Sequence, residues 1–266
     1  MIEMPESKLS VVPCLGIPIT ACTPAQAALE VVRLATTDLD HGVDIHLCSA
    51  HGFSLADTDP RFKAMLQRAA INFPDGKSVV WANKLLHRGT TIPNDRVYGP
   101  DLFLDVFEKG QELGLRHYLL GATPQVLTAL QTELRRRFPK AAIVGAVSPP
   151  FRALTEQEIA EQTARLVESK AQVVWIGLGT PKQDWESARL AGDIAAIFIA
   201  VGAAFDFVAG EKRQAPMWMQ RNGLEWLFRL AVEPRRLWRR YLFGNARFLR
   251  AIIREMLRAY RSTART

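Results

Sequence analysis

Residues 172–183, QVVWIGLGTPKQ, indicate the fold of this chain most directly. The stretch begins with an apolar run rich in β-branched side chains, which is typical of a strand covered on both faces. Gly177 and Gly179 end this run, and Thr180 and Pro181 then supply the signals of a helix start. A strand, a glycine turn and a helix in direct succession form one unit of a parallel α/β sheet.

The same pattern recurs along the chain. Four more short apolar runs predict strands, at residues 43–48, 116–120, 141–147 and 196–202. Between the strands, five helices are predicted directly behind a Thr or Asp cap, at residues 24–36, 60–70, 124–138, 156–169 and 181–191. This alternation predicts right-handed βαβ units, and therefore an α/β fold in which helices flank a parallel sheet.

Three of the predicted strands end in glycine, at Gly121, Gly179 and Gly202. Ligands bind outside the carboxyl ends of the strands in a parallel sheet, and a helix N-terminus behind a glycine can hold a phosphate. The turns at Gly121 and at Gly179–Thr180 therefore predict a nucleotide or phosphate site, unless the glycines merely permit tight turns. The chain has no P-loop motif and no dinucleotide fingerprint after its first strand, which disfavours those two classes of nucleotide-binding protein.

The last fifty residues carry the positive charge of the chain. Residues 217–266 contain twelve Arg, no Lys and three Glu, a net charge of +9, whereas the whole chain carries +7. The composition changes near Pro216. We therefore predict a globular core over residues 1–215 and a basic helical appendage over residues 216–266.

Large apolar side chains, including three of the six Trp, are interleaved with these arginines at helical spacing. This mixture favours an anionic membrane surface as the partner of the appendage, with nucleic acid and a docked protein as the alternatives. No apolar run reaches the ~18 residues of a membrane span. The three cysteines are odd in number and lack metal-ligand spacing, which favours a reducing compartment. We therefore expect a peripheral protein at the cytoplasmic face of the cell membrane, with no nucleic acid as partner.

Eight motifs carry a resemblance that extends over roughly residues 10–250: 74–81 (PDGKSVVW), 95–102 (DRVYGPDL), 118–121 (YLLG), 177–183 (GLGTPKQ), 201–210 (VGAAFDFVAG), 215–216 (AP), 223–230 (GLEWLFRL) and 233–236 (EPRR). In this order they resemble the WecG/TagA/CpsF glycosyltransferases, family 26. The resemblance implies a Rossmann-like fold. It also implies transfer of a sugar, with inversion, from a UDP-sugar to a polyprenyl-diphosphate-linked sugar at the cytosolic membrane face, without a required metal.

An inverting transfer needs a carboxylate that accepts the proton of the acceptor hydroxyl. Asp75 is the candidate, both by its match to the family and because it stands at the start of a predicted helix, whose N-terminus would keep its pKa low. The alternative is that Asp75 only caps this helix.

Two further residues are implied as parts of the catalytic site. Arg96 matches the family's arginine and could hold the diphosphate of UDP as a bidentate donor, with a surface ion pair to Asp95 or Asp101 as the alternative. Gln183, in the first turn of the helix behind Gly179, could bind the nucleotide or a sugar.

The remaining candidates would bind substrate. Where the family often has a Thr-x-Asn signature, residues 47–51 read LCSAH, so either Ser49 or His51 stands in place of the Asn. Asp206 follows the strand that ends near Gly202, and could bind ribose or uracil or stabilise the turn.

The appendage of the family both docks on the membrane and lends arginines to the active site. By motif position these arginines are Arg229, Arg236 and Arg239, whose spacing places them on one helical face if Pro234 does not break the helix. The arginines that remain are assigned to lipid headgroups: Arg240, Arg247, Arg250, Arg254, Arg258 and Arg261.

Neither D-x-D sequence, at residues 38–40 and 57–59, directly follows a predicted strand, so we expect no essential metal and no cofactor besides the sugar donor. A non-catalytic membrane scaffold, or a protein that binds a nucleotide or nucleic acid without catalysis, remains as the rival function. The identity of the two sugars and the oligomeric state stay open, with a homo-oligomer among the options.

Overall fold

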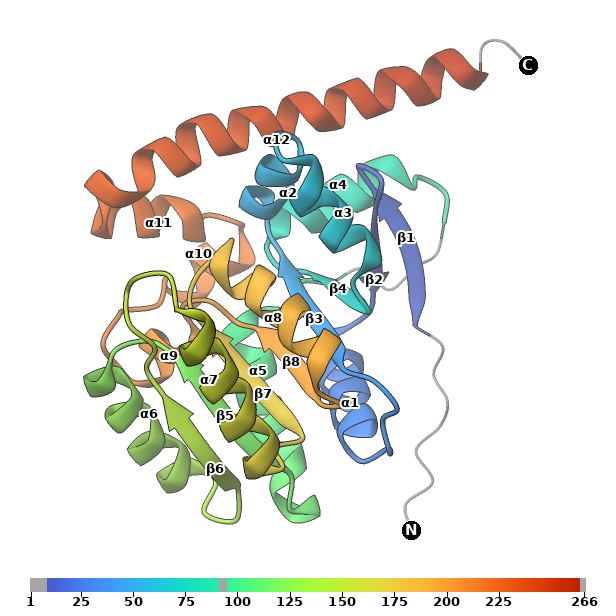
Figure 1. Cartoon of the computed structure of the whole chain (residues 1–266). Coiled ribbons are helices and arrows are strands. Elements are labelled where there is room, and N and C mark those ends of the chain that lie inside the picture. The colour runs from blue at the N-terminus through green and yellow to red at the C-terminus, as the bar shows by residue number, and fades with distance from the viewer. Residues whose placement is uncertain (1–8, 91–94, 264–266) are drawn as a thin grey trace.

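A six-stranded parallel sheet forms the centre of the structure, a computed structural model that describes residues 9–90 and 95–263 (Figure 1). The strand order is β4-β3-β8-β7-β5-β6. All five predicted strands are present, as β3 (Val43–Cys48), β5 (Arg116–Gly121), β6 (Ala142–Val147), β7 (Val173–Gly177) and β8 (Ile197–Ala200). The prediction of a parallel sheet flanked by helices is therefore confirmed.

Four of the five predicted helices begin where capping side chains place them. Their caps are Thr23, Asp59, Thr123 and Thr155, each of which accepts a hydrogen bond from a backbone amide in the first turn. The helices are α1 (Pro24–Ala35), α3 (Pro60–Arg68), α6 (Pro124–Arg137) and α7 (Glu156–Ser169). The fifth differs slightly, because α8 (Lys182–Asp193) begins behind Pro181 and no side chain caps it.

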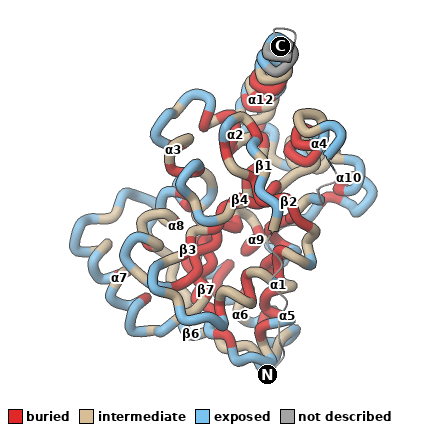
Figure 2. The backbone as a smooth tube through the Cα atoms, turned by 90° about the vertical axis from the view of Figure 1, so that its right-hand side faces the viewer, coloured by how far each residue is buried: buried red, intermediate tan, exposed pale blue. Residues whose placement is uncertain are grey.

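Buried side chains alternate between the two faces of the sheet. Trp175 and Ile199 pack with α1, α6 and α5 (Gly99–Gly110) on one face. Val174 and Phe198 pack with α7 and α8 on the other face. Both faces are therefore covered, which explains why these strands are continuous apolar runs in the sequence, and the burial of the central strands is visible in Figure 2.

Several short elements were not predicted from the sequence. The strands β1 (Ser10–Cys14) and β2 (Ile17–Ala21) form an antiparallel hairpin, whose two connecting residues, Leu15 and Gly16, both have positive φ, as tight hairpin turns require. The edge strand β4 (Ile71–Pro74) has only four residues and lacks an apolar run. The 12-residue helix α5 was not predicted either, and the other unpredicted elements are α2 (Ala50–Ala56), the full length of α4 (Lys77–Leu86), η1 (Gln111–Leu113), α9 (Ala204–Val208) and α10 (Met217–Arg221).

The appendage consists of α10, α11 (Glu225–Val232) and the long helix α12 (Pro234–Thr263). Pro234 is the first residue of α12, so it separates two helices, and the condition under which Arg229, Arg236 and Arg239 would share one helical face is not met. The helix α12 lies across the end of the molecule that holds α2 (Figure 1). Phe248 and Ile252 of α12 are buried in one hydrophobic cluster with residues of α2, α3 and α4.

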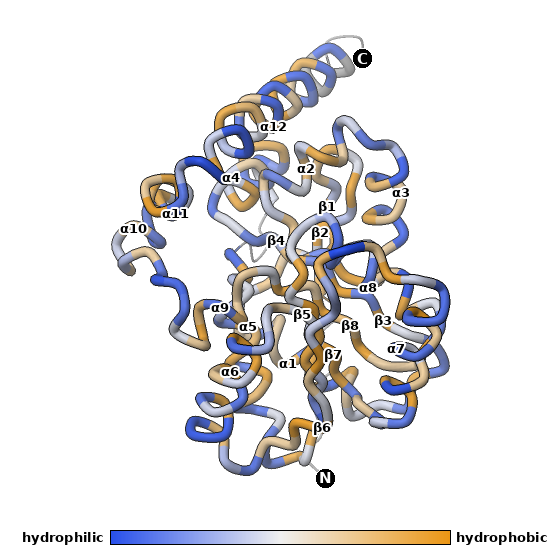
Figure 3. Tube along the Cα trace, turned by 60° about the vertical axis from the view of Figure 1, so that its left-hand side comes forward, coloured by the Kyte–Doolittle hydropathy of each residue, from blue (hydrophilic) through white to orange (hydrophobic). Residues whose placement is uncertain are grey.

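The exposed side of α12 mixes arginines with large apolar residues along its whole length, as the alternating colours in Figure 3 show. Among the residues that the structure describes, no helix is both long enough and apolar enough to cross a bilayer.

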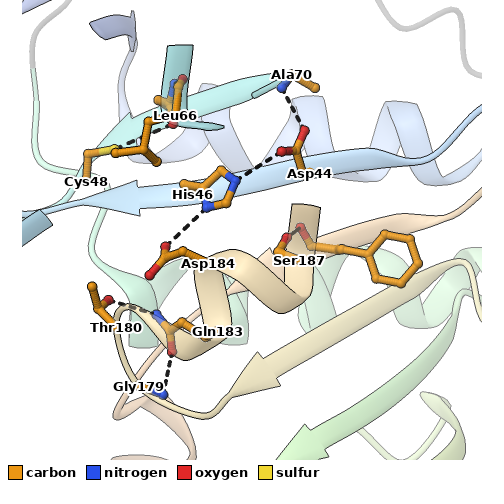
Figure 4. A network of polar contacts seen from close by, with 12 residues as sticks. Asp44, His46, Cys48, Leu66, Ala70, Gly179, Thr180, Gln183, Asp184 and Ser187 are labelled. Carbon is orange, nitrogen blue, oxygen red and sulfur yellow. Dashed lines mark hydrogen bonds and ion pairs between the residues drawn. The ribbon is translucent and has the colours of Figure 1, made fainter. Parts of the chain in front are cut away.

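A buried polar network connects β3 to the helix layer (Figure 4). His46 on β3 is fully buried, and its two ring nitrogens lie 3.1 Å from carboxylate oxygens of Asp184 and Asp44. Asp44 also accepts a hydrogen bond from the backbone amide of Ala70, at the entry to β4. Burial alone would lower the pKa of His46, but the hydrogen bonds to Asp184 and Asp44 raise it to about 9. The imidazolium therefore links β3, α8 and the segment before β4.

This network predicts a stability that depends on pH. The pKa of His46 is raised from 6.5 to about 9 on folding, so its contribution is complete below pH 6.5 and is lost as the pH rises through about 9. The free energy of unfolding, measured by urea denaturation between pH 7 and pH 9, should fall with pH in the native chain. The same slope should be absent in His46→Gln.

A direct measurement covers the case in which His46→Gln does not fold. NMR titration of the native His46 ring should give a pKa near 9, and a ring that titrates at or below 6.5 would contradict this account.

Candidate active site

The carboxyl ends of β3 and β4 lie side by side, with Cys48 paired to Pro74, so Ser49 and Asp75 follow neighbouring strand ends. A cavity of about 460 Å³ lies in front of them. The start of α2 and nearly the whole length of α4 form one side of this cavity, and α11 and α12 form the other. The candidate site is thus built between the core and the appendage.

The backbone around Asp75 is fixed by two hydrogen bonds. The amide of Asp75 donates to the carbonyl oxygen of Cys48 at 2.9 Å, and the carbonyl oxygen of Pro74 accepts from the amide of Val97 at 2.9 Å. Gly76, with a φ of +108°, is the residue before α4, and no side chain caps this helix. The carboxylate of Asp75 is therefore not a helix cap, and it faces the cavity instead.

Arg96 lies between two carboxylates. Its Nε is 3.8 Å from Oδ1 of Asp75, and its Nη2 donates to Oε2 of Glu225 at 2.5 Å. The guanidinium also stacks 3.7 Å from the centre of the Tyr98 ring, and only 9% of the Arg96 side chain is exposed. Among the described residues, its ion-pair partners are thus Asp75 and Glu225, and not Asp95 or Asp101, which were the alternative from the sequence. Arg96 instead connects the candidate base to the appendage.

Glu225 is a site residue that sequence reasoning missed. It is the first residue of α11, and its second carboxylate oxygen accepts a hydrogen bond from the hydroxyl of Tyr98 at 3.3 Å. Burial raises the pKa of Tyr98, so this phenol stays protonated and donates. Glu225 stands inside the motif 223–230, but its partner Arg96 is 129 residues away in the sequence. The motif therefore includes Glu225, but it does not indicate that Glu225 contacts Arg96.

The pKa of Asp75 departs from the sequence-based expectation. Burial in the cavity raises this pKa to about 6, against the opposing effect of Arg96, and the negative charge of Glu225 raises it further. The prediction that a helix N-terminus keeps the pKa low is therefore wrong, because Asp75 precedes the first residues of α4 and its carboxylate points into the cavity. Near pH 7 most of this carboxyl group is still ionised.

Two arginines of the appendage face the cavity: Arg229, which was among the three predicted for the site, and Arg240, which was not. Arg229 of α11 and Arg240 of α12 both line it. Arg236 instead pairs with Glu233 at 2.5 Å, and the side chain of Arg239 lies over the ring of Trp238 at 5.2 Å. The assignment of Arg240 to lipid headgroups is thus corrected. Its Nε is buried and makes no hydrogen bond with any residue that the structure describes, so it remains available to a ligand.

Ser49 and His51, the two candidates for a sugar contact, both line the same cavity. Ser49 precedes α2 but its side chain does not cap that helix. Burial lowers the pKa of His51 to about 4, with a further contribution from the positive charge of Arg240, so this imidazole is neutral at pH 7. The structure therefore brings Ser49 and His51 together with Asp75 and Arg96, as the resemblance implied.

The other predicted residues lie at a second location, over the ends of β5, β7 and β8, and outside the cavity. Since β7 is two strands from β3, the two locations are separated by about 10 Å along the sheet. Gly121, with a φ of +129°, packs so closely on Gly177 that an added Cβ would lie 2.6 Å from its carbonyl. The positive φ and this close packing require a glycine at position 121, so the turn itself explains Gly121.

Gln183 stabilises the turn in front of it. Its Oε1 accepts from the amide of Gly179 at 2.9 Å and its Nε2 donates to the hydroxyl of Thr180 at 3.4 Å, as Figure 4 shows. Gly179 itself is exposed, and a Cβ there would meet no other atom within 4 Å. Asp206 in α9 forms an ion pair of 3.2 Å with Lys212. The turn at Gly179 thus has open space beside it, whereas the Asp206 carboxylate already has a partner.

Both acids of the D-x-D sequence at residues 57–59 have other partners. Asp57 pairs with Arg254 of α12 at 2.5 Å, and Asp59 caps α3. Within residues 9–90 and 95–263, no three His, Cys, Asp or Glu side chains are grouped so that they could hold a metal ion.

Comparison with known proteins agrees with this geometry. A sequence model described as the glycosyl transferase WecG/TagA/CpsF family matches residues 12–262. The chain is also similar to an N-acetylglucosaminyldiphosphoundecaprenol N-acetyl-beta-D-mannosaminyltransferase from Bacillus spizizenii, with 30% identity over 216 residues, 80% of each protein. The family match includes the sheet, both sides of the cavity and nearly all of α12, and on this basis the chain belongs to the WecG/TagA/CpsF family of glycosyltransferases.

Proposed function

We propose that the protein transfers a sugar, with inversion, from a UDP-sugar to a sugar linked to a polyprenyl diphosphate in cell-surface polysaccharide synthesis. The observation that carries this proposal is the cavity, in which the candidate base Asp75 lies beside the cations Arg96, Arg229 and Arg240. The name of the Bacillus spizizenii relative supports a lipid-diphosphate-linked sugar as the acceptor. The diphosphate of such a substrate is a natural ligand for arginines.

The reaction is a single displacement at the anomeric carbon. The acceptor hydroxyl oxygen forms a bond to this carbon while Asp75 accepts the hydroxyl proton, and the bond to UDP breaks with its electron pair leaving on the diphosphate. A pKa of about 6 leaves Asp75 ionised near neutral pH and close to the value that suits a general base. The nearby arginines stabilise negative charge as it develops.

The two groups of predicted residues suggest a division of tasks. The turn at Gly179 and Thr180 remains the candidate for the nucleotide, because Gly179 is exposed with open space beside it at the end of β7. The cavity beside Asp75 is the candidate for the acceptor, because it contains the arginines and an apolar wall. In this division Gln183 supports the nucleotide turn and does not touch the reacting atoms.

We further infer that the appendage places the enzyme on the anionic cytoplasmic surface of the cell membrane. Exposed apolar residues accompany the arginines along α10, α11 and α12, including Trp218, Leu242, Phe243, Ile253 and Leu257. Such a surface can enter the headgroup region while the arginines hold anionic lipids, whereas nucleic acid would leave the apolar residues in water. Flotation with vesicles that contain anionic lipid measures this directly, and failure to float would overturn the location.

The first prediction concerns the base. Asp75→Asn keeps the size of the side chain but cannot accept the proton, so turnover should fall roughly 10²–10⁴-fold. The affinity for UDP, measured by calorimetry, should change little. Turnover of the variant within twofold of the native enzyme would remove Asp75 from the mechanism.

The second prediction concerns the pH dependence set by the charges around Asp75. Because only the ionised carboxylate accepts a proton, kcat/KM should rise with pH and level off above about pH 6. The charged groups that face Asp75 are Arg96, Glu225, Arg229 and Arg240. Of these, only Glu225 raises its pKa, so Glu225→Gln should move the inflection of the profile to lower pH.

Glu233→Gln is the matched control, because Glu233 also belongs to the appendage but pairs with Arg236. Its pH profile should coincide with that of the native enzyme. An inflection that stays in place in Glu225→Gln, or that moves equally in both variants, would contradict the proposed influence of Glu225 on Asp75.

The third prediction compares two neighbouring arginines of α12. Arg240 faces the cavity, whereas Arg239 lies over Trp238 outside it. Loss of one charge-assisted hydrogen bond costs about 1.5–3 kcal/mol, so Arg240→Ala should raise the KM for a lipid-diphosphate acceptor roughly 10- to 100-fold. Arg239→Ala should stay close to the native value in a soluble assay without vesicles. Equal effects of the two substitutions would exclude a specific role of Arg240.

A further inference from the structure

The cavity changes character along its length. On α4, its lining residues pass from Lys77 and Ser78 at the start of the helix to apolar side chains further on, at Trp81, Ala82 and Leu85. On α12, they pass from Arg240 through Tyr241 and Asn245 to a fully apolar group, Phe248, Leu249 and Ile252. Each helix therefore contributes one charged end and one apolar end.

The two gradients run in the same direction. At the charged end, Arg240 is close enough to influence the pKa of Asp75, which is two residues before Lys77. At the apolar end, Ala82 and Leu85 of α4 share one hydrophobic cluster with Phe248 and Ile252 of α12. With a rise of about 1.5 Å per residue, the lining spans roughly 12 Å along α4 and 18 Å along α12.

The apolar end is open to the surroundings. Trp81 and Leu249 line the cavity, yet 54% and 60% of their surfaces are exposed. Leu249 also belongs to the row of exposed apolar residues on α12 that continues through Ile253 and Leu257. An apolar opening that is continuous with an exposed apolar helix face is typical of a lipid or membrane contact.

We propose that the apolar end of the cavity is a channel for the first isoprenyl units of the acceptor. This isoprenyl channel is formed by six side chains: Trp81, Ala82, Leu85, Phe248, Leu249 and Ile252. The lipid enters from the membrane between α4 and α12, its diphosphate lies at Arg229 and Arg240, and its sugar reaches Asp75. The assignment of the occupant rests on the proposed function.

The chemistry of the lining favours this occupant over others. Apart from the indole nitrogen of Trp81, the channel offers no hydrogen-bonding side chain, so a nucleobase or a peptide would leave polar groups unsatisfied there. A saturated or isoprenoid chain has no hydrogen-bonding groups to satisfy, so burial of its apolar surface in the channel is favourable. Only a molecule with an anionic head and an apolar chain matches both ends of the cavity.

Binding of prenyl diphosphates tests the channel without requiring turnover. Geranyl, farnesyl and geranylgeranyl diphosphate, together with inorganic pyrophosphate, would be titrated by calorimetry below their micelle concentrations and without vesicles or detergent. Because each buried CH₂ contributes about 0.8 kcal/mol, affinity should rise at least about tenfold from geranyl to geranylgeranyl diphosphate. Equal affinity of all four ligands would overturn the channel.

Two substitutions on α12 form a matched pair. Leu249→Glu places a charge in the channel, and Ile253→Glu places one on an exposed position of the same helix outside the cavity. Leu249→Glu should bring the affinities of the prenyl diphosphates within about twofold of each other and leave the affinity for pyrophosphate unchanged. Ile253→Glu should keep the native dependence on chain length. Loss of this dependence in both variants would show that the chain lies on the outer face of α12, and would overturn the channel.

A transfer assay separates failure of the channel from failure of the proposed function. Native enzyme that binds prenyl diphosphates in the expected order but transfers no sugar to any lipid-diphosphate sugar would contradict the proposed function and leave the channel standing. Transfer that occurs with a KM independent of lipid length, in the absence of vesicles, would contradict the channel and leave the function standing.

Discussion

The contact of Arg96 with Glu225 is the interaction on which the site depends. It joins the segment that follows β4 to the first residue of α11. Tyr98 contacts both partners, so these three side chains form a contact between the core and the appendage. Since the guanidinium is almost completely buried, its charge needs the two carboxylate partners, Asp75 and Glu225, and loss of both would leave this charge without compensation. The same guanidinium lies 3.8 Å from Asp75. Arg96 therefore contributes both to holding the appendage on the core and to the electrostatics of the candidate base.

This arrangement makes the appendage part of the site as well as a surface for docking. The core contributes the strand ends with Ser49 and Asp75, while the appendage contributes Glu225, Arg229 and Arg240. Because α12 is anchored to α2 by Phe248 and Ile252, its arginines are held at a fixed distance from the sheet. The exposed side of the same helix carries the apolar residues proposed to meet the membrane. One helix can thus connect the lipid surface to the reacting groups.

The polar network around His46 and the turn around Gln183 support the sheet that carries the site. His46 fixes α8 against β3, and Gln183 at the start of α8 fixes the turn that follows β7. These groups lie behind the strand ends rather than in the cavity. Gln183, which the sequence suggested as a ligand of the nucleotide or of a sugar, therefore helps to hold the turn behind β7 in place.

The sequence by itself determined the five strands with continuous apolar runs, the capped helices between them and the residues of several motifs. Those features depend on local signals: continuous apolar runs such as 172–178, caps such as Thr155, and the change of composition near Pro216. The sequence did not determine the short strand β4 or the hairpin of β1 and β2, because four or five residues at an edge carry little pattern.

Only the tertiary structure decided which arginines reach the cavity and what pKa Asp75 has. Arg239 and Arg240 are neighbours in the sequence, but successive side chains of a helix point in different directions. Which of the two faces the cavity depends on how α12, which begins at Pro234, packs on α2. Likewise, Glu225 is 129 residues from Arg96, and the pKa of Asp75 depends on its burial in the cavity and on Glu225, Arg229 and Arg240, which belong to the distant segments α11 and α12. Side-chain direction, burial and contacts between distant residues are properties of the packed chain, and no local pattern encodes them.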